Sequence, residues 1–200
     1  MRLAARHADW ALGFGDEVWW SRVSQPNCHA WAGEQPLRLV EQTVAKADPD
    51  PKALAAYGVL LQGAGSPEPE VWLRFSAGRP VSALTTAFLA WCCDGLAARG
   101  KRVLLLVWDN ASWHLSQEVR AWVRAHNQQV KRTGRGVRIV LCFLPVKSPW
   151  LNPIEPHWVH GKRRVAEPAR LLTANELEQR VCAAFNVPRY DHLTVTKDAA

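Results

Sequence analysis

Two acidic residues are candidates for catalysis or metal binding because of where they lie. One follows a predicted strand, and the other lies at the start of a predicted helix. Asp109 directly follows the apolar run Val103–Trp108, which is typical of a strand buried on both faces in a parallel sheet. Glu155 follows Asn152, a suitable helix N-cap, and Pro153, which suits the first helical position. Ligands and metals collect outside the carboxyl ends of strands in open α/β sheets. Asp109 is therefore a candidate site residue.

The spacing of Asn152 and Glu155 has a structural alternative. It approximates a capping box, in which the Glu155 carboxylate only accepts a hydrogen bond from the backbone of the cap residue. Capping is commoner than catalysis. The spacing alone therefore favours a structural role for Glu155.

A third acid lies near the start of the chain. Large and small residues alternate over Trp10–Glu17, which predicts a strand with Leu12, Phe14 and Asp16 on one face and Glu17 on the other. By this period Asp16 is the acid that faces the packed side. An isolated Asp-Glu pair is more often a solvated turn between strands, so the pair needs further support.

Two longer motifs supply that support through a family resemblance. They are Trp108–His114 and the proline-rich segment Leu144–Trp158. Both resemble the second and third acidic motifs of bacterial insertion-sequence transposases related to mariner. These are DDE-type enzymes with an RNase H-like catalytic domain. Asp16 followed by Glu17 matches the first acidic motif of that family.

The resemblance implies a transposase catalytic domain that performs metal-dependent DNA strand cleavage and strand transfer of an insertion sequence. It implies that Asp16, Asp109 and Glu155 are catalytic and hold Mg²⁺ or Mn²⁺ as two ions. Two such cations about 4 Å apart activate the attacking water and stabilise the leaving oxygen. The alternative is a decayed or domesticated RNase H-like domain that binds DNA non-specifically without catalysis.

Strand and helix patterns surround these motifs and predict an α/β fold with a mixed central sheet and helices on both faces. The predicted strands are Trp10–Glu17, Val18–Val23, Leu37–Gln42, Tyr57–Gln62, Val71–Phe75, Val103–Trp108 and Val137–Pro145. The predicted helices are Ser82–Arg99, Ser116–Asn127, a helix starting near Pro153, and a capped helix Thr173–Phe185. A polar, glycine-punctuated loop is expected over Gln128–Arg138.

A formal net charge of +7 favours a polyanionic partner. Six Lys and Arg residues and no acid occur from Arg120 to Arg138. Beside a DNA-cutting site, such side chains suit contacts to phosphates. For Asn110 and His114 the structural alternatives are a helix cap and a hydrogen-bonded surface histidine. The expected DNA-binding residues are Asn110, His114, Lys131, Arg132, Arg135, Lys162, Arg163 and Arg164.

Length and composition bound the remaining expectations. A chain of 200 residues that is 48% hydrophobic suits a single domain over residues 1–200. Five cysteines without CxxC spacing suggest reduced core thiols. Neither a membrane-spanning run nor a signal peptide is recognisable, so we expect a cytoplasmic protein without a membrane partner.

The resemblance also bears on partners. Members of the family carry N-terminal helix-turn-helix modules that recognise the ends of the element, and none is recognisable before Trp10. We therefore expect that the recognition region is absent from this domain, and that strand transfer to a chosen element end requires either a separate helix-turn-helix subunit or the missing N-terminal region. The expected partners are the DNA of the element ends and of the target, and a second copy of the chain during transposition.

Overall fold

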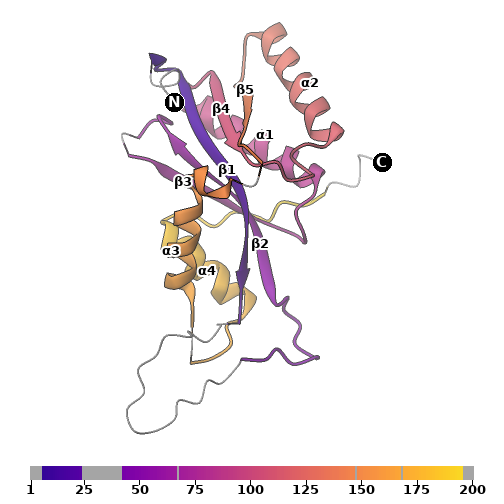
Figure 1. Ribbon diagram of the computed structural model, residues 1–200, viewed down its shortest axis with the longest axis vertical. Coiled ribbons are helices and arrows are strands. Elements are labelled where there is room, and N and C mark those ends of the chain that lie inside the picture. Colours follow the sequence, from indigo (N-terminus) through magenta and orange to yellow (C-terminus); the bar gives the residue numbers. More distant parts are fainter. Residues whose placement is uncertain (1–5, 24–41, 67, 147, 168, 196–200) are drawn as a thin grey trace.

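The computed structural model describes residues 6–23, 42–66, 68–146, 148–167 and 169–195 (Figure 1). The predicted strand Leu37–Gln42 lies outside these residues except for Gln42, which is in no strand. Cys28 also lies outside them. Of the described cysteines, all are free thiols; three are buried, whereas Cys142 is exposed and is not the core thiol that composition suggested.

The described chain builds a mixed five-stranded sheet of order β3-β2-β1-β4-β5. Its strands are β1 (Trp10–Ser21), β2 (Ala53–Gln62), β3 (Glu70–Ser76), β4 (Val103–Trp108) and β5 (Arg138–Phe143). The first three strands form an antiparallel meander, and β1, β4 and β5 run parallel. The predicted mixed sheet is confirmed.

Four α-helices and a short 3-10 turn complete the described fold. They are α1 (Ser82–Ala98), α2 (Gln117–Thr133), the turn Pro149–Leu151, α3 (Glu155–Val165) and α4 (Ala174–Phe185). One hydrophobic core joins α1 and α2 to the sheet, and a second joins α3 and α4 to its other face (Figure 1). Helices therefore cover both faces, as predicted. Within the described residues, no helix is long and apolar enough to cross a bilayer.

The register of β1 sets the position of the first acid. β1 pairs with β4 only as far as Phe14, which lies opposite Val107. The same register, continued by two residues, brings Asp16 level with Asp109. Beyond this point β1 stays paired with β2, where Asp16 lies opposite Gly58. Two acids from distant parts of the sequence therefore lie at the same level, just beyond the carboxyl end of β4.

The structure corrects two local predictions. Val18–Val23 is not a separate strand, because no turn residue interrupts β1 and β2 is long enough to pair with it through Ser21. Much of the expected loop Gln128–Arg138 is helical, since the buried Val130 continues the apolar stripe of α2. The helix ends where Gly134 adopts the left-handed conformation at φ 66°.

The burial of β4 is also less complete than predicted. Leu104, Leu106 and Trp108 are buried, whereas the alternate residues are only partly covered. The reason is that α3 and α4 lie beside the β1-β2-β3 part of the sheet and leave the outer part of this face with little cover (Figure 1). β4 is therefore only partly covered on one face, although it has a parallel neighbour on each side.

A glycine opposite the first acid gives a test of packing. A Cβ built on Gly58 would lie 2.3 Å from Cη2 of Trp158, which rests on β2 at this point. We expect Gly58→Ala to lower the free energy of unfolding by about 1–3 kcal/mol, because the indole must shift within a packed core. Urea denaturation measures the change.

The matched control is Val159→Ala, which alters an exposed side chain next to Trp158 in α3. It should change the free energy of unfolding by less than about 0.5 kcal/mol. Equal stability of Gly58→Ala and the wild type would contradict the packing of Trp158 on Gly58.

Candidate active site

Asp16 is held at the site by two hydrogen bonds. Its Oδ2 accepts from Nε1 of Trp158 at 2.9 Å, and its Oδ1 accepts from the backbone N–H of Glu17 at 2.8 Å. Burial, together with repulsion from Glu155 and Glu17, raises the pKa of Asp16 to about 7 despite these hydrogen bonds. The two hydrogen bonds therefore do not fully offset the burial of this carboxylate and its repulsion by the other acids.

Asp109 stands just beyond the carboxyl end of β4, as predicted. Its Oδ1 accepts from the backbone N–H of Ala111 at 2.9 Å and lies 2.8 Å from Nδ1 of His114. The hydrogen bond to His114 lowers the pKa of Asp109, against the effect of its partial burial. The side chain is 50% exposed. Its Oδ2 has no hydrogen-bond partner among the described residues.

Glu155 begins α3 and is not part of a capping box. Asn152, the expected N-cap, makes no cap bond; it is buried, and its Nδ2 donates to the carbonyl of Gly15 at 3.1 Å. The Glu155 carboxylate accepts no hydrogen bond within the described part of the chain. Burial and the charge of Asp109 raise its pKa, while Lys162 lowers it. The structural alternative for Glu155 therefore does not hold.

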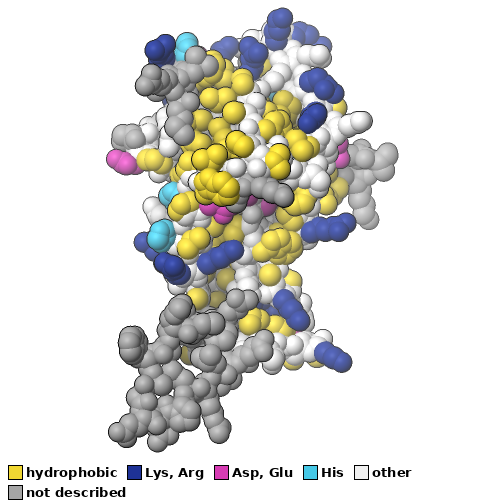
Figure 2. Space-filling view, in the orientation of Figure 1, with side chains coloured by type: hydrophobic (Ala, Val, Ile, Leu, Met, Phe, Trp, Pro, Cys, Tyr) yellow, Lys and Arg dark blue, Asp and Glu magenta, His cyan; other side chains and the backbone are white. Residues whose placement is uncertain are grey.

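Glu155 lies close enough to Asp16 and to Asp109 for the negative charges to interact. Asp16 responds to the charge of Glu155, and Glu155 responds to the charge of Asp109. Acidic side chains gather in the middle of the face shown in Figure 2. Among the described residues, however, no three His, Cys, Asp or Glu side chains form a ready-made metal cage. The oxygens are of the kind that hard cations prefer.

Glu17 is the important residue that sequence patterns missed. Its carboxylate is only 8% exposed, and its Oε1 lies 2.9 Å from Nε2 of His114. Its Oε2 accepts from Nε1 of Trp113 at 3.0 Å. The alternation of β1 correctly placed Asp16 and Glu17 on opposite faces, but both faces are packed here. The inference that only Asp16 faces a packed side is wrong.

His114 is not a surface histidine. Its side chain is 1% exposed, stacks on Trp108 with ring centroids 4.2 Å apart, and lies between the carboxylates of Asp109 and Glu17. Burial disfavours its charged form, but the hydrogen bonds and charges of the two acids raise its pKa to about 9. A protonated ring donates to both. This burial contradicts the expectation that His114 contacts DNA.

The other predicted DNA-binding residues fall into separate places. Asn110 is no helix cap; its Nδ2 donates to the carbonyl of Leu144 at 2.6 Å and ties the ends of β4 and β5 together. On α3, the predicted residues are all exposed and lie on the helix that begins with Glu155. They are Lys162, Arg163 and Arg164.

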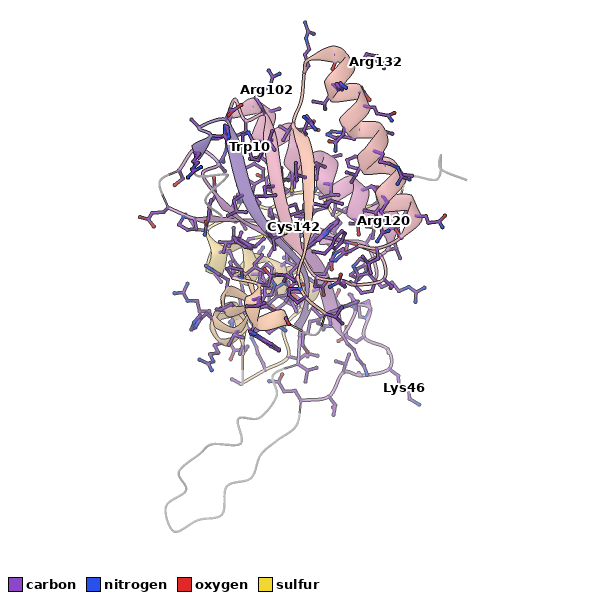
Figure 3. All side chains as sticks on the ribbon, turned by 45° about the horizontal axis from the view of Figure 1, so that its top comes forward. Trp10, Lys46, Arg102, Arg120, Arg132 and Cys142 are labelled. Carbon is purple, nitrogen blue, oxygen red and sulfur yellow. The ribbon has the colours of Figure 1, made fainter. Side chains whose placement is uncertain are left out.

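The basic residues near the end of α2 are not brought to the acids. Lys131, Arg132 and Arg135 lie where Arg102 donates to the carbonyl of Gly134, before the start of β4 (Figure 3). Asp109 follows the other end of that strand. A six-residue strand spans about 20 Å. These three residues therefore lie at the opposite end of the parallel strands from Asp109.

Comparisons with known proteins identify the family that part of the chain matches and the fold that it shares. Residues 82–178, which include Asp109 and Glu155, match the family described as DDE superfamily endonuclease. No curated protein matches the chain. The fold is shared with the Mos1 strand transfer complex, at 15% identity and a TM-score of 0.54 over 94% of this chain and 51% of that one.

Two further solved structures have the same fold. The Mos1 transposase paired-end complex with left transposon end shares 15% identity at a TM-score of 0.59, over 94% of this chain and 52% of that one. The Mos1 mariner paired end complex with Mn shares 16% identity at 0.57, over 94% and 52%. The present chain spans about half the length of these proteins. The likeness shows an RNase H-like fold.

The role of Asn152 can be tested by one substitution. Asp serves as well as Asn at an N-cap. At position 152, however, an Asp carboxylate could not donate a hydrogen bond to the Gly15 carbonyl and would place a negative charge beside that oxygen. We expect Asn152→Asp to lower the free energy of unfolding by about 2 kcal/mol or more. Ser116→Asp is the control, because Ser116 is a true cap that accepts from Val119. If both substitutions left the free energy of unfolding nearly unchanged, the interpretation of Asn152 as an N-cap would be supported instead.

Proposed function

We propose that this chain, which carries a DDE superfamily endonuclease domain, is the catalytic part of a mariner-related transposase. The observation that supports the proposal is that Glu155, at the start of α3, interacts electrostatically both with Asp16 in the middle of β1 and with Asp109 at the end of β4. Burial and repulsion between the acids raise the pKa of Asp16 and of Glu155, although Lys162 opposes the rise at Glu155, and the hydrogen bond to His114 lowers the pKa of Asp109. The reaction is DNA strand cleavage followed by strand transfer.

Divalent metal suits this set of donors. Asp16, Asp109 and Glu155 would hold Mg²⁺ or Mn²⁺, with two ions as the proposed number, and solved Mos1 paired end complexes contain Mg and Mn. Bound cations would activate the attacking water and stabilise the leaving oxygen. Among the described residues, neither Oδ2 of Asp109 nor the Glu155 carboxylate accepts a hydrogen bond, which supports this assignment. The raised pKa of Asp16 does so too, because a nearby cation would relieve the repulsion among the acids.

The protein's own groups would position the substrate. Lys162, Arg163 and Arg164 extend from the acids along the exposed side of α3, where they can bind phosphates. Lys131, Arg132 and Arg135 form a second basic area, which we propose contacts the same DNA about 20 Å away. Phosphate contacts position a duplex without reading its sequence.

Recognition of a particular DNA end should then come from elsewhere. The matched Mos1 structures are named as paired-end and strand transfer complexes of a protein about twice as long. We propose that this chain acts on paired element ends as a homodimer, with sequence recognition supplied by a helix-turn-helix region or subunit. The proposed cellular location is the cytoplasm.

Metal-dependent nicking of supercoiled plasmid tests the activity. We expect nicking with Mg²⁺ or Mn²⁺, none in EDTA, and a loss of at least about 100-fold in Asp109→Asn, because an amide is a poor ligand for a hard cation. The matched control is Asp94→Asn, which alters an exposed acid of α1 and should leave the rate unchanged. DNA binding without any metal-dependent nicking would favour the non-catalytic alternative.

The two basic areas can be compared through salt dependence. Replacing Lys162, Arg163 and Arg164 with Ala should reduce the slope of log K against log salt by up to about 2.7, since each phosphate contact contributes about 0.9. Fluorescence anisotropy with random duplex DNA measures the slope. The same replacement of Lys131, Arg132 and Arg135 should weaken binding but spare nicking at saturating DNA. An unchanged slope in the α3 variant would contradict its proposed role.

A further inference from the structure

A fourth acid stands behind the proposed metal ligands. Glu17 follows Asp16 in β1, so the two carboxylates point to opposite faces of the sheet. Asp16 faces α3 and Trp158, whereas Glu17 faces Trp113 and His114. With 8% of its side chain exposed, Glu17 has little room for a substrate or a hydrated cation.

Both oxygens of Glu17 are used by groups from the segment after β4. Oε2 accepts from Nε1 of Trp113 at 3.0 Å, and Oε1 lies 2.9 Å from Nε2 of His114. A buried carboxylate with two donors has a fixed orientation, because any rotation would leave a donor unpaired at a cost of about 1–3 kcal/mol. Glu17 thus fixes the position of the His114 ring through its Nε2 atom.

The other end of the imidazole reaches Asp109. Nδ1 of His114 lies 2.8 Å from Oδ1 of Asp109, and the ring is stacked on Trp108 at an interplanar angle of 13°. Stacking fixes the plane of the ring, and Glu17 fixes its rotation within that plane. One Asp109 oxygen is therefore held by His114 and the N–H of Ala111, while Oδ2 has no hydrogen-bond partner in the part of the chain that the structure describes.

Stability alone does not account for this chain of contacts. Buried ion pairs can often be replaced by apolar side chains without loss of stability. Moreover, the chain ends on Asp109, which is 50% exposed and needs no buried partner to be solvated. Hydrogen bonds behind a ligand commonly fix its orientation, and removing them typically costs 10–100-fold in metal affinity.

We propose that Glu17 is a positioning residue, which acts through His114 to hold the Asp109 carboxylate in the orientation that binds the cation. The inference rests on the proposed function, because Asp109 must be a metal ligand. Glu17 itself touches neither metal nor DNA. The first and second acidic segments are then coupled through a buried contact, in addition to meeting at the site.

The test is Glu17→Gln, which keeps the shape but removes the charge and leaves one amide N–H₂ facing a donor. Mn²⁺ binding to the protein without DNA is measured by electron paramagnetic resonance, with thermal unfolding measured in parallel. We expect the Kd for Mn²⁺ to rise 10–100-fold, and the Mn²⁺ concentration for half-maximal nicking to rise with it. Glu118→Gln, an exposed acid in the first turn of α2, is the matched control and should change neither.

A double-mutant cycle separates positioning from a general loss of structure. If Glu17 acts through Asp109, Glu17→Gln should have little further effect on Mn²⁺ affinity in the Asp109→Asn background, because the group that it positions is gone. Trp113→Phe, which removes the indole N–H and replaces the indole with a smaller phenyl ring, should raise the Kd in the same direction by a smaller factor. This variant leaves the Glu17 carboxylate and an aromatic ring at position 113 in place, and it serves as the second test if Glu17→Gln proves unstable.

The outcomes are distinct. Wild-type Mn²⁺ affinity in both Glu17→Gln and Trp113→Phe, in a protein that nicks DNA, would overturn the positioning role and leave the proposed function standing. Equal effects of Glu17→Gln with and without Asp109 would also overturn it. A wild-type protein that neither binds Mn²⁺ nor nicks DNA would overturn the proposed function and this inference together.

Discussion

The site depends on the burial of two adjacent carboxylates that leave one strand in opposite directions. Asp16 is held by the indole of Trp158, which reaches it from α3 across the glycine at position 58 of β2. Glu17 is held by Trp113 and His114 from the segment that follows β4. One dipeptide of β1 therefore joins the elements that carry the other two acids. If β1 shifted by one residue, both carboxylates would lose their partners at once.

The charges on the two sides of β1 are balanced differently. On the Glu17 side, His114 lies between two carboxylates and compensates them, which is why the pKa of Asp109 is low and that of His114 is raised. On the Asp16 side the burial and mutual repulsion of the acids are only partly offset, and the pKa of Asp16 reaches about 7. Because ionisation of Asp16 is disfavoured in the folded protein, its contribution to stability is present below the ordinary carboxyl pKa of 3.8 and is lost as the pH rises from there to about 7. A bound cation would remove that cost.

Most of the fold followed from local patterns. The apolar run Val103–Trp108 predicted β4, the hydrophobic spacing after Ser82 predicted α1, and the capping box at Thr173 predicted the start of α4. These patterns work because strand and helix periods act over a few residues. The length of α2 was missed, since its polar surface resembled a loop and the buried Val130 alone marked its continuation.

The sequence by itself determined that Asp109 ends a strand, that Asp16 and Glu17 face opposite ways, and that a family motif contains Glu155. It could not decide how Asn152 is used, because the capping box and the contact to Gly15 share one local pattern and differ only in a long-range partner. Nor could it show that Glu17 is buried or that His114 bridges two carboxylates. Those facts required the register of β1 against β4 and the packing of helices on both faces. Periodicity gives the direction of a side chain, whereas only tertiary structure supplies what it meets.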